Sequence, residues 1–306
     1  MSTTSPGRPA PGPDAAGAGA PGSGAVGPGA LLDALRAVQA RLDADGAPAP
    51  AATPRPRVSE DARGRSLQFG DDVVQSRHDP QEPARLLLPY TRRMAGALLW
   101  HPAPRTVLMI GLGGGSLVRF LREVSPASVL AVAEINPQVV ALRGPFDLPP
   151  DDGRWSVLTV DGARLLQGWA AAGAPPAALR PQVLLVDGFD ADGLAAPLTT
   201  AAFFTAAAGV LARDGWLVMN LWAPAAQRRQ VRQRVAAAFA GRTVFTVDDA
   251  VDEDQQVLYA GGPPHGAVHP RPVHEALARL GPGPARDCPR LHESWHEVHA
   301  AWAAQA

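Results

Sequence analysis

Glycines and carboxylates that could hold a nucleoside follow one another through the middle of the chain. The apolar run TVLMI at 106–110 leads into the glycine-rich stretch GLGGGS at 111–116, and a helical pattern follows at once. Glycines let a backbone turn tightly and approach a ligand, and a helix start offers free N–H groups. Glu134 ends the next apolar run, 23 residues after Gly111, where a carboxylate can accept hydrogen bonds from ribose hydroxyls. This pattern favours a nucleotide-type ligand.

Acidic residues also end the following two strands of the pattern. Asp161 ends the third strand and can meet an adenine edge, while Asp187 ends the fourth and is followed by Asp190. These groups all fall at the carboxyl ends of strands, where open α/β sheets bind their ligands. The alternative is that the acids serve only as helix caps and turn residues. The combination favours a nucleoside site.

Strand and helix patterns alternate along this part of the chain, which predicts an open, doubly wound, Rossmann-like α/β sheet. The expected strands are 106–110, 129–133, 156–160, 182–186, 216–221, 243–247 and 256–260, and the expected helices are 117–124, 137–143, 162–171, 200–212 and 227–239. The last two strands are close enough in sequence to form an antiparallel hairpin. The seven-stranded sheet should therefore end in an antiparallel strand.

Flanking segments complete the expected organisation. Residues 1–57 are rich in glycine and proline, which predicts a low-complexity, disordered tail with one amphipathic helix at 30–44. Residues 58–104 should hold a small β-hairpin at 66–76, turning at Gly70-Asp71-Asp72, and a helix at 83–100. The nucleoside-binding domain then spans 105–262, and residues 263–306 should add C-terminal helices.

Composition narrows the function classes. The 306 residues carry a net charge of −1 with no basic excess, so we expect no nucleic-acid partner. All 28 basic residues are arginine, which excludes a lysine Schiff base and a P-loop lysine. Cys288 is the single cysteine, and neither a signal-peptide pattern nor an apolar run of about 18 residues occurs. We expect a cytoplasmic protein without disulfides and without a membrane partner.

One motif suggests a metal. The stretch His292-Glu293-Ser294-Trp295-His296 matches the H-E-x-x-H signature of zinc peptidases, and His299 follows on the same helix face. A third histidine only one turn further along one helix is poorly placed to complete a tetrahedral site. The motif also belongs to no catalytic domain of its own. We interpret it as an ordinary helix face and expect no metal.

Several stretches resemble blocks of the spermidine synthase-like family, the polyamine aminopropyltransferases, which have the class I S-adenosylmethionine-dependent methyltransferase fold. These stretches are VLMIGLGGGSLVRFL, AVAEINPQVV, SVLTVDGARLL and VLLVDGFDADGLAAPLTTAAFF, preceded by LQFGDDVVQS and PYTRRM. The resemblance covers residues 66–261. It implies a transferase of polyamine biosynthesis that moves an aminopropyl or related group to a small-molecule amine, with decarboxylated or intact S-adenosylmethionine as co-substrate. It leaves a homodimer open.

The resemblance also implies roles for residues around the co-substrate. Gly111, Gly113 and Gly115 would hold its methionine-derived part. Glu134 matches the acid that binds the ribose, and Asp161 matches the acid that contacts the adenine.

On the acceptor side, Asp187 matches the family's catalytic aspartate. Asp190 and Gln75 match its acceptor ligands, and Tyr90 matches a tyrosine of the site. An acceptor amine with a pKa of about 10 arrives protonated and cannot attack. A carboxylate that takes the proton and holds the nitrogen in line suits this chemistry.

Two departures from the family pattern keep other functions open. Gly114 stands where the family's GGGDGG loop has its aspartate, and the loop is one residue shorter. The family's Tyr-His-Glu becomes Tyr90-Thr91-Arg92, which would place a cation where an acid attracts a polyamine. The alternatives are a small-molecule methyltransferase, a transferase whose anionic or neutral acceptor is bound by Arg92, and a non-catalytic nucleoside-binding protein.

Overall fold

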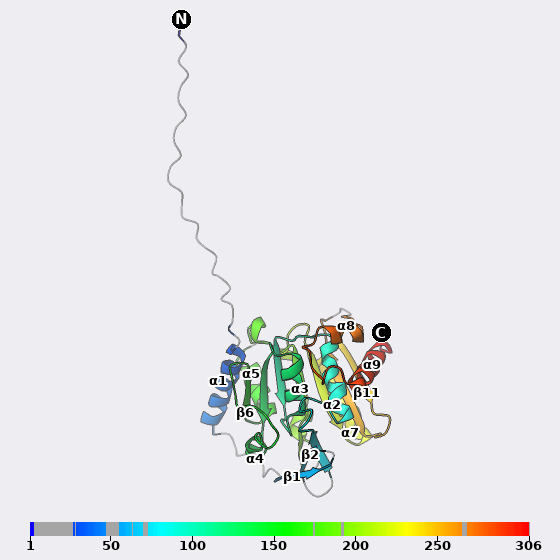
Figure 1. Cartoon of the computed structure of the whole chain (residues 1–306). Coiled ribbons are helices and arrows are strands. Elements are labelled where there is room, and N and C mark those ends of the chain that lie inside the picture. The colour runs from blue at the N-terminus through cyan, green and yellow to red at the C-terminus, as the bar shows by residue number, and fades with distance from the viewer. Residues whose placement is uncertain are drawn as a thin grey trace.

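The computed structural model of the chain describes residues 1–2, 27, 29–46, 55–62, 64–69, 73–173, 175–190, 193–264 and 268–305. Its centre is a seven-stranded sheet with helices on both faces (Figure 1). Across the sheet the strands are β11 (Thr243–Asp248), β12 (Gln255–Gly261), β10 (Trp216–Trp222), β7 (Val183–Val186), β4 (Thr106–Ile110), β5 (Val129–Glu134) and β6 (Trp155–Thr159).

The strand directions confirm the predicted doubly wound sheet. Strands β10, β7, β4, β5 and β6 pair in parallel, while β12 runs antiparallel to both of its neighbours, β10 and β11. The antiparallel strand is the last strand in the sequence, yet it lies second from the edge of the sheet. The hairpin partner β11 takes the edge position itself.

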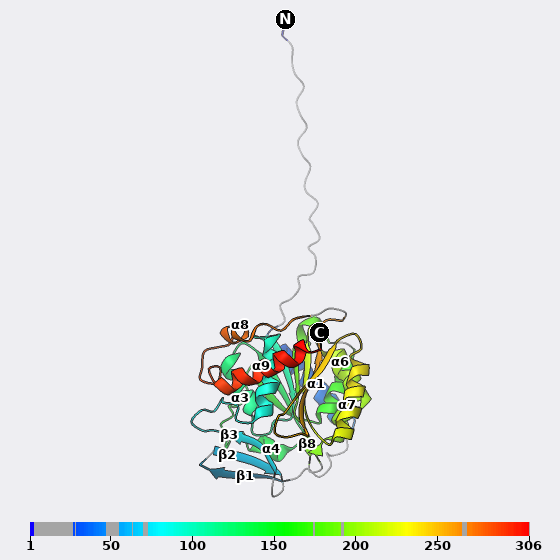
Figure 2. The same ribbon diagram turned by 90° about the vertical axis from the view of Figure 1, so that its right-hand side faces the viewer.

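Helices cover the two faces of the sheet and enclose two apolar cores (Figure 2). One face carries α2 (Pro89–Met94), α3 (Ser116–Val124), α8 (Val273–Ala278) and α9 (Pro289–Ala303), and the other carries α1 (Ala30–Ala44), α5 (Gly162–Ala171), α6 (Ala201–Val210) and α7 (Ala225–Ala238). Strand β4 contributes side chains to both cores. Val107 and Met109 are buried in one core, and Leu108 and Ile110 are buried in the other. This alternation makes the uninterrupted apolar run of the sequence a strand buried on both sides.

Shorter elements fill the connections. Helix α4 (Pro137–Ala141) follows β5, and the 3-10 turns η2 (Ala177–Leu179) and η3 (Ala196–Thr199) flank β7 and its loop. A two-stranded ribbon of β8 (Phe189–Asp190) and β9 (Gly193–Leu194) follows β7. No helix in the described ranges is long and apolar enough to cross a bilayer.

The N-terminal sheet has three strands where the sequence pattern predicts two. Strands β2 (Gly64–Phe69) and β3 (Val73–His78) form the expected hairpin, and the expected turn at 70–72 lies outside the described residues. Strand β1 (Pro56–Asp61) pairs antiparallel with β2 and starts inside the segment expected to be tail. Its sequence PRVSED is almost wholly exposed, so it has no hydrophobic alternation that would reveal a strand.

The expected helix at 83–100 is shorter than predicted. Regular helix begins with Pro89 as α2 and continues into the 3-10 turn η1 (Ala95–Leu99). Proline suits a first helical position, and its ring forces the preceding residue, Leu88, into extended backbone. The guanidinium of Arg92 donates to the carbonyls of Leu86 and Leu87, which ties the extended approach to the helix.

The helix expected within the N-terminal segment forms with the predicted bounds as α1, and it is docked on the body. Leu31, Leu32, Leu35 and Val38 are buried in the core on the face that carries α5. The amphipathic spacing of these residues therefore reflects packing on the sheet. Most of the remaining residues of the expected tail lie outside the described ranges.

Candidate active site

The glycine-rich loop after β4 brings two strand ends into direct contact. Gly111 has a φ of +89°, and a Cβ on this residue would lie 2.0 Å from the carbonyl oxygen of Asp187. Only glycine fits a position that combines left-handed backbone with such a close approach. The loop after β4 and the carboxylate after β7 are therefore held side by side.

Glu134, at the end of β5, holds the glycine-rich loop through hydrogen bonds on the side of β4 opposite β7. One carboxylate oxygen, Oε2, accepts a hydrogen bond of 2.7 Å from the Leu112 N–H, and Oε1 accepts one of 2.8 Å from the Asn136 N–H. Burial raises the pKa of Glu134, and the bonds from backbone N–H groups oppose that rise. The N–H groups of Gly113 and Ile135 also oppose the rise, so four backbone donors surround the carboxylate.

Asp161, at the end of β6, caps helix α5. Its Oδ1 accepts hydrogen bonds from the N–H groups of Ala163, at 2.8 Å, and Arg164, at 3.3 Å. The interpretation of this acid as a helix cap is thus correct for one oxygen. The residue also lines the large cavity described next, so it can contact a ligand there in addition to capping the helix.

A cavity of about 650 Å³ lies at the carboxyl ends of the parallel strands. Its wall includes these residues predicted from the sequence: Gly111, Gly113, Glu134, Asp161, Asp187, Asp190 and Gln75. Gly115 is not part of the wall; it has a φ of +73°, precedes α3, and a Cβ there would lie 2.5 Å from a side-chain carbon of Leu148. Glycine at 115 therefore suits the left-handed backbone and the close packing of Leu148 behind the loop.

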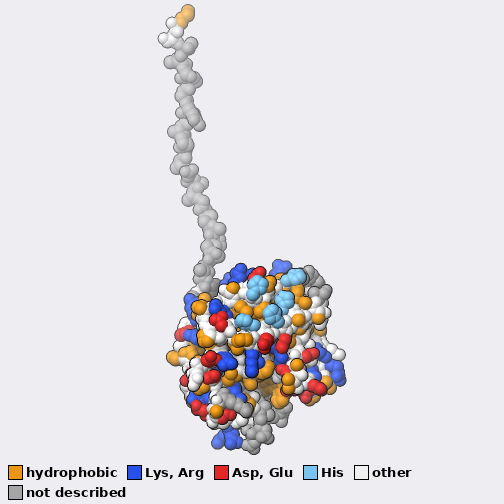
Figure 3. Space-filling view, turned by 45° about the vertical axis from the view of Figure 1, so that its right-hand side comes forward, with side chains coloured by type: hydrophobic (Ala, Val, Ile, Leu, Met, Phe, Trp, Pro, Cys, Tyr) orange, Lys and Arg blue, Asp and Glu red, His pale blue; other side chains and the backbone are white. Residues whose placement is uncertain are grey.

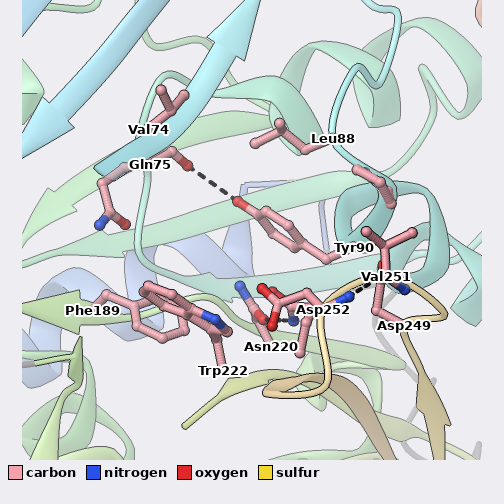
Figure 4. A pocket seen from close by; sticks show the side chains of 12 residues that line it. Val74, Gln75, Leu88, Tyr90, Phe189, Asn220, Trp222, Asp249, Val251 and Asp252 are labelled. Atoms are coloured by element: carbon pink, nitrogen blue, oxygen red, sulfur yellow. Dashed lines mark hydrogen bonds between the residues drawn. The ribbon is translucent and has the colours of Figure 1, made fainter. Parts of the chain in front are cut away.

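A second cavity, of about 330 Å³, adjoins the first and shares Gln75 and Phe189 with it (Figure 4). The ring of Phe189 packs against that of Trp222, with centroids 6.2 Å apart. Asp249 and Asp252 line the cavity from the turn between β11 and β12. Among the described residues of its wall the charged side chains are these carboxylates, and none is cationic.

Asp187 lies where the two cavities meet. Asp187 belongs to the wall of the large cavity, while both of the residues that donate to its carboxylate, Tyr90 and Asn220, line the small one. Asn220 Nδ2 donates to Oδ1 at 2.9 Å, and the Tyr90 hydroxyl donates to Oδ2 at 3.2 Å. Burial raises the pKa of Asp187 to about 6, and these two hydrogen bonds limit the rise.

Tyr90 and Asn220 are themselves held in place. The Tyr90 hydroxyl also lies 3.2 Å from the backbone carbonyl of Gln75, drawn as a dashed line in Figure 4. Gln255 Nε2 donates to Asn220 Oδ1 at 2.6 Å, which leaves the amide N–H₂ of Asn220 for Asp187. Sequence reasoning missed Asn220, although a polar residue near the end of the apolar strand WLVMNLW is the kind of signal that identified Asp187.

Relatives of known function resemble the chain over most of their length. No protein-family model matches it. The polyamine aminopropyltransferase of Chromobacterium violaceum is 35% identical over 198 residues, which cover 64% of this chain and 73% of that protein. The chain belongs to the polyamine aminopropyltransferase family. The family member of Neisseria meningitidis serogroup B is 33% identical over 199 residues, with the same coverage of 64% and 73%.

Solved structures of two kinds of protein share the fold of the chain. A probable spermidine synthase from Corynebacterium glutamicum has a TM-score of 0.56 at 17% identity, with 73% of this chain and 82% of that chain covered. A spermidine synthase in complex with the transition-state analogue AdoDATO has a TM-score of 0.54 at 17% identity, with 70% and 72% covered. Human methyltransferase-like protein 13, solved with SAH, has a TM-score of 0.52 at 20% identity, with 71% and 93% covered.

The structure places Arg92, one of the departures from the aminopropyltransferase pattern, away from the acceptor. The expectation that Arg92 reaches the acceptor is wrong: its side chain is buried, and Nη1 donates to the carbonyls of Leu86 and Leu87 at 2.9 and 2.8 Å. The next cation, Arg93, pairs with Asp249 at 2.5 Å and with Glu297 at 2.7 Å. Neither guanidinium lines a cavity wall, so neither repels a cationic acceptor there by direct contact.

Gly114 has no space for the aspartate of the family loop. A Cβ at this position would lie 2.7 Å from Ser76 Oγ and 3.0 Å from the Phe146 ring. Arg119 holds this arrangement, because its Nη1 donates to the carbonyls of both Gly114 and Phe146 at 2.6 Å. Burial lowers the pKa of Arg119 to about 10. Phe146 thus fills space next to the loop that a larger residue at 114 would need.

Asp190 and the histidine motif complete the comparison with the sequence. Asp190 is exposed on β8 and belongs to the wall of the larger cavity. The histidine motif lies on α9, where His292 Nε2 is 2.9 Å from the Arg286 carbonyl, and histidines gather on one face of the molecule (Figure 3). In the described part of the chain, no group of three His, Cys, Asp or Glu side chains is arranged to hold a metal ion.

Proposed function

We propose that the chain transfers an aminopropyl group from decarboxylated S-adenosylmethionine to a small cationic amine. The observation that carries this proposal is the position of Asp187 between a large cavity and a smaller one lined by carboxylates. The large cavity offers glycine backbone, Glu134 and Asp161 to a nucleoside. The small one offers carboxylates, amides and aromatic rings, which suit an alkyl-ammonium ion.

Asp187 would be the general base. The co-substrate supplies a carbon made electrophilic by the neighbouring sulfonium, and displacement at that carbon releases a neutral thioether nucleoside. An ammonium group bound beside Asp187 must lose a proton before its nitrogen lone pair can form the new C–N bond. With a pKa of about 6, Asp187 is mostly ionised at neutral pH and can receive that proton. Its two donors fix the orientation of the carboxylate toward the junction.

Gln75 and Asp190 would guide the reacting groups. Gln75 lines both cavities, so its amide can contact a nitrogen that reaches from the small cavity into the large one. Asp190 lines the large cavity from the exposed ribbon after β7 and would attract a cation to the junction. In this proposal Tyr90 positions Asp187 through the hydrogen bond between them.

The nucleoside product decides the reaction. The protein is incubated with decarboxylated or intact S-adenosylmethionine and a mixed panel of amines, and the nucleoside is identified by mass. Methylthioadenosine supports aminopropyl transfer. S-adenosylhomocysteine would show methyl transfer, the alternative that the glycine at 114 keeps open, and no turnover with any amine would contradict an enzyme. The Asp187→Asn variant is the matched control, since a product that persists in it does not arise from the proposed site.

A further inference from the structure

The last turn of helix α1 forms part of the wall of the large cavity. Leu42 and Asp43 line it together with residues 159–161 at the end of β6 (the helix lies beside β6 and α5 in Figure 1). They come from a segment that precedes the N-terminal sheet, whereas Phe69 and Gln75 of the wall come from that sheet and the other lining residues come from the seven-stranded unit. A helix that only covered the sheet would not line this cavity.

Helix α1 is fixed to the same strand end that carries Asp161. Gln39 Nε2 donates to the Thr159 carbonyl at 3.2 Å, and Arg36 Nη2 donates to Ser156 Oγ at 3.1 Å. Apolar residues of the earlier turns of the helix, from Leu31 to Val38, are buried in the core beneath it. The helix therefore holds Leu42 and Asp43 at a defined place beside the expected base end of the cavity.

Helix α1 packs closely against α5 near its C-terminal end. A Cβ on Gly168 of α5 would lie 3.3 Å from Val38 Cγ1 and 3.4 Å from Leu42 Cδ2. The glycine lets the two helices approach closely at this point, so the Leu42 side chain is in contact with α5 as well as with the cavity. Leu42 is partly buried with no nucleoside present, and it presents apolar surface to the cavity.

The carboxylate of Asp43 does not help to stabilise helix α1. A carboxylate in the last turn of a helix opposes the helix dipole, which costs roughly 0.3–1 kcal/mol at an exposed site. Its side chain makes no hydrogen bond or ion pair with the described residues, whereas Asp33 in the first turn pairs with Arg36. Asp43 thus presents an unpaired acceptor at the rim of the cavity.

We infer that the end of α1 is a specificity element of the nucleoside site. Leu42 packs against the purine face, and the Asp43 carboxylate accepts a hydrogen bond from the exocyclic amino group of the purine. This inference rests on the proposed function only in taking a 6-aminopurine nucleoside as the occupant of the large cavity. It assigns recognition of the base to two elements, the end of β6 and the end of α1.

Titration calorimetry with 5′-methylthioadenosine and its 6-oxo analogue, 5′-methylthioinosine, tests the inference. Leu42→Ser should weaken binding of both nucleosides about tenfold, since it removes apolar contact with the ring. Asp43→Ala should weaken the amino compound about fivefold and leave the oxo compound unchanged or tighter, because a carboxylate repels a carbonyl oxygen. Arg41→Gln is the control, an exposed residue on the same turn that does not line the cavity.

The outcomes separate this inference from the proposed function. If the wild-type protein binds neither nucleoside, the proposed nucleoside site itself fails. If it binds methylthioadenosine and both variants bind it with wild-type affinity and selectivity, α1 has no role in recognition and the inference is overturned. Asp43 is exposed, so its variant should fold normally. A circular dichroism melt that matches the wild type checks this.

Discussion

The hydroxyl of Tyr90 donates a hydrogen bond of 3.2 Å to Oδ2 of Asp187, and the side-chain amide of Asn220 donates one of 2.9 Å to Oδ1 of the same carboxylate. Both oxygens thus have a protein donor before any substrate arrives. A carboxylate oxygen can accept more than one hydrogen bond, so an incoming ammonium group would share them with these donors. The arrangement stabilises the ionised form of an acid that burial would otherwise drive toward protonation.

Replacement of Asp187 by Asn should abolish transfer and spare nucleoside binding. The amide keeps the shape of the side chain but cannot take a proton, so we expect kcat to fall by about 10²- to 10⁴-fold. Calorimetry with methylthioadenosine should give a Kd close to that of the wild type. A variant that retains full turnover would remove Asp187 from the mechanism.

The transfer rate should depend on pH through the ionisation of Asp187. Because the base must be deprotonated and its pKa is about 6, kcat at pH 5 should be about tenfold lower than at pH 7. Tyr90→Phe removes a hydrogen bond that lowers this pKa, so the acidic limb should move to higher pH. A pH profile of kcat for both proteins measures the shift, and identical acidic limbs would contradict the role given to Tyr90.

Restoring the family's aspartate at position 114 should destabilise the fold. The new Cβ would clash with Ser76 and the Phe146 ring, and the buried carboxylate would have no space, so we expect a loss of about 2–3 kcal/mol in unfolding free energy. Gly144→Asp is the matched control, because a Cβ at Gly144 meets nothing within 4 Å. Urea unfolding compares them. Equal stability of the two variants would show that the loop can rearrange.

Arg93 should govern acceptor binding through the turn between β11 and β12. It neutralises Asp249, whose Oδ1 accepts from the N–H groups of Val251 and Asp252 at 2.8 and 3.2 Å. Arg93→Met leaves that largely buried carboxylate without its cation, which we expect to cost about 3 kcal/mol of stability and to displace the turn. Because the turn forms part of the wall of the small cavity, the KM for the amine should rise.

Glu297→Gln provides the control for Arg93, since it removes only the half-exposed partner of the guanidinium. We expect a change below about 1 kcal/mol and an unaltered KM. Calorimetry with methylthioadenosine should give wild-type Kd values for both variants. An unchanged amine KM in Arg93→Met would mean that the turn is not held by this ion pair.

The sequence made much of the large cavity predictable, because strand ends in a parallel sheet meet at one edge. Gly111, Glu134, Asp161 and Asp187 each follow an apolar run, and the fold brings them together for that reason. Asn220 follows the same rule and could have been found in the same way. Gly115 shows the limit of the argument, because the same glycine signal arises from packing against Leu148.

Side-chain direction could not be read from the sequence. Arg92 follows Tyr90 by two positions, yet the tyrosine points into the site while the arginine is buried against two carbonyls. One residue of helix turns a side chain by about 100°, so nearness in sequence does not place two side chains on one face. The docking of α1 was likewise hidden, since amphipathic spacing shows an apolar face without showing what covers it.

The burial of α1 also bears on how the chain can be shortened. A version that began at β1 would lack Leu31, Leu32, Leu35 and Val38 and would uncover the apolar surface that they occupy beside β5, β6 and α5. Contiguous apolar surface of that kind promotes self-association. Expression trials that trim the glycine- and proline-rich leader should therefore stop before residue 29, and affinity tags are better joined upstream of that point.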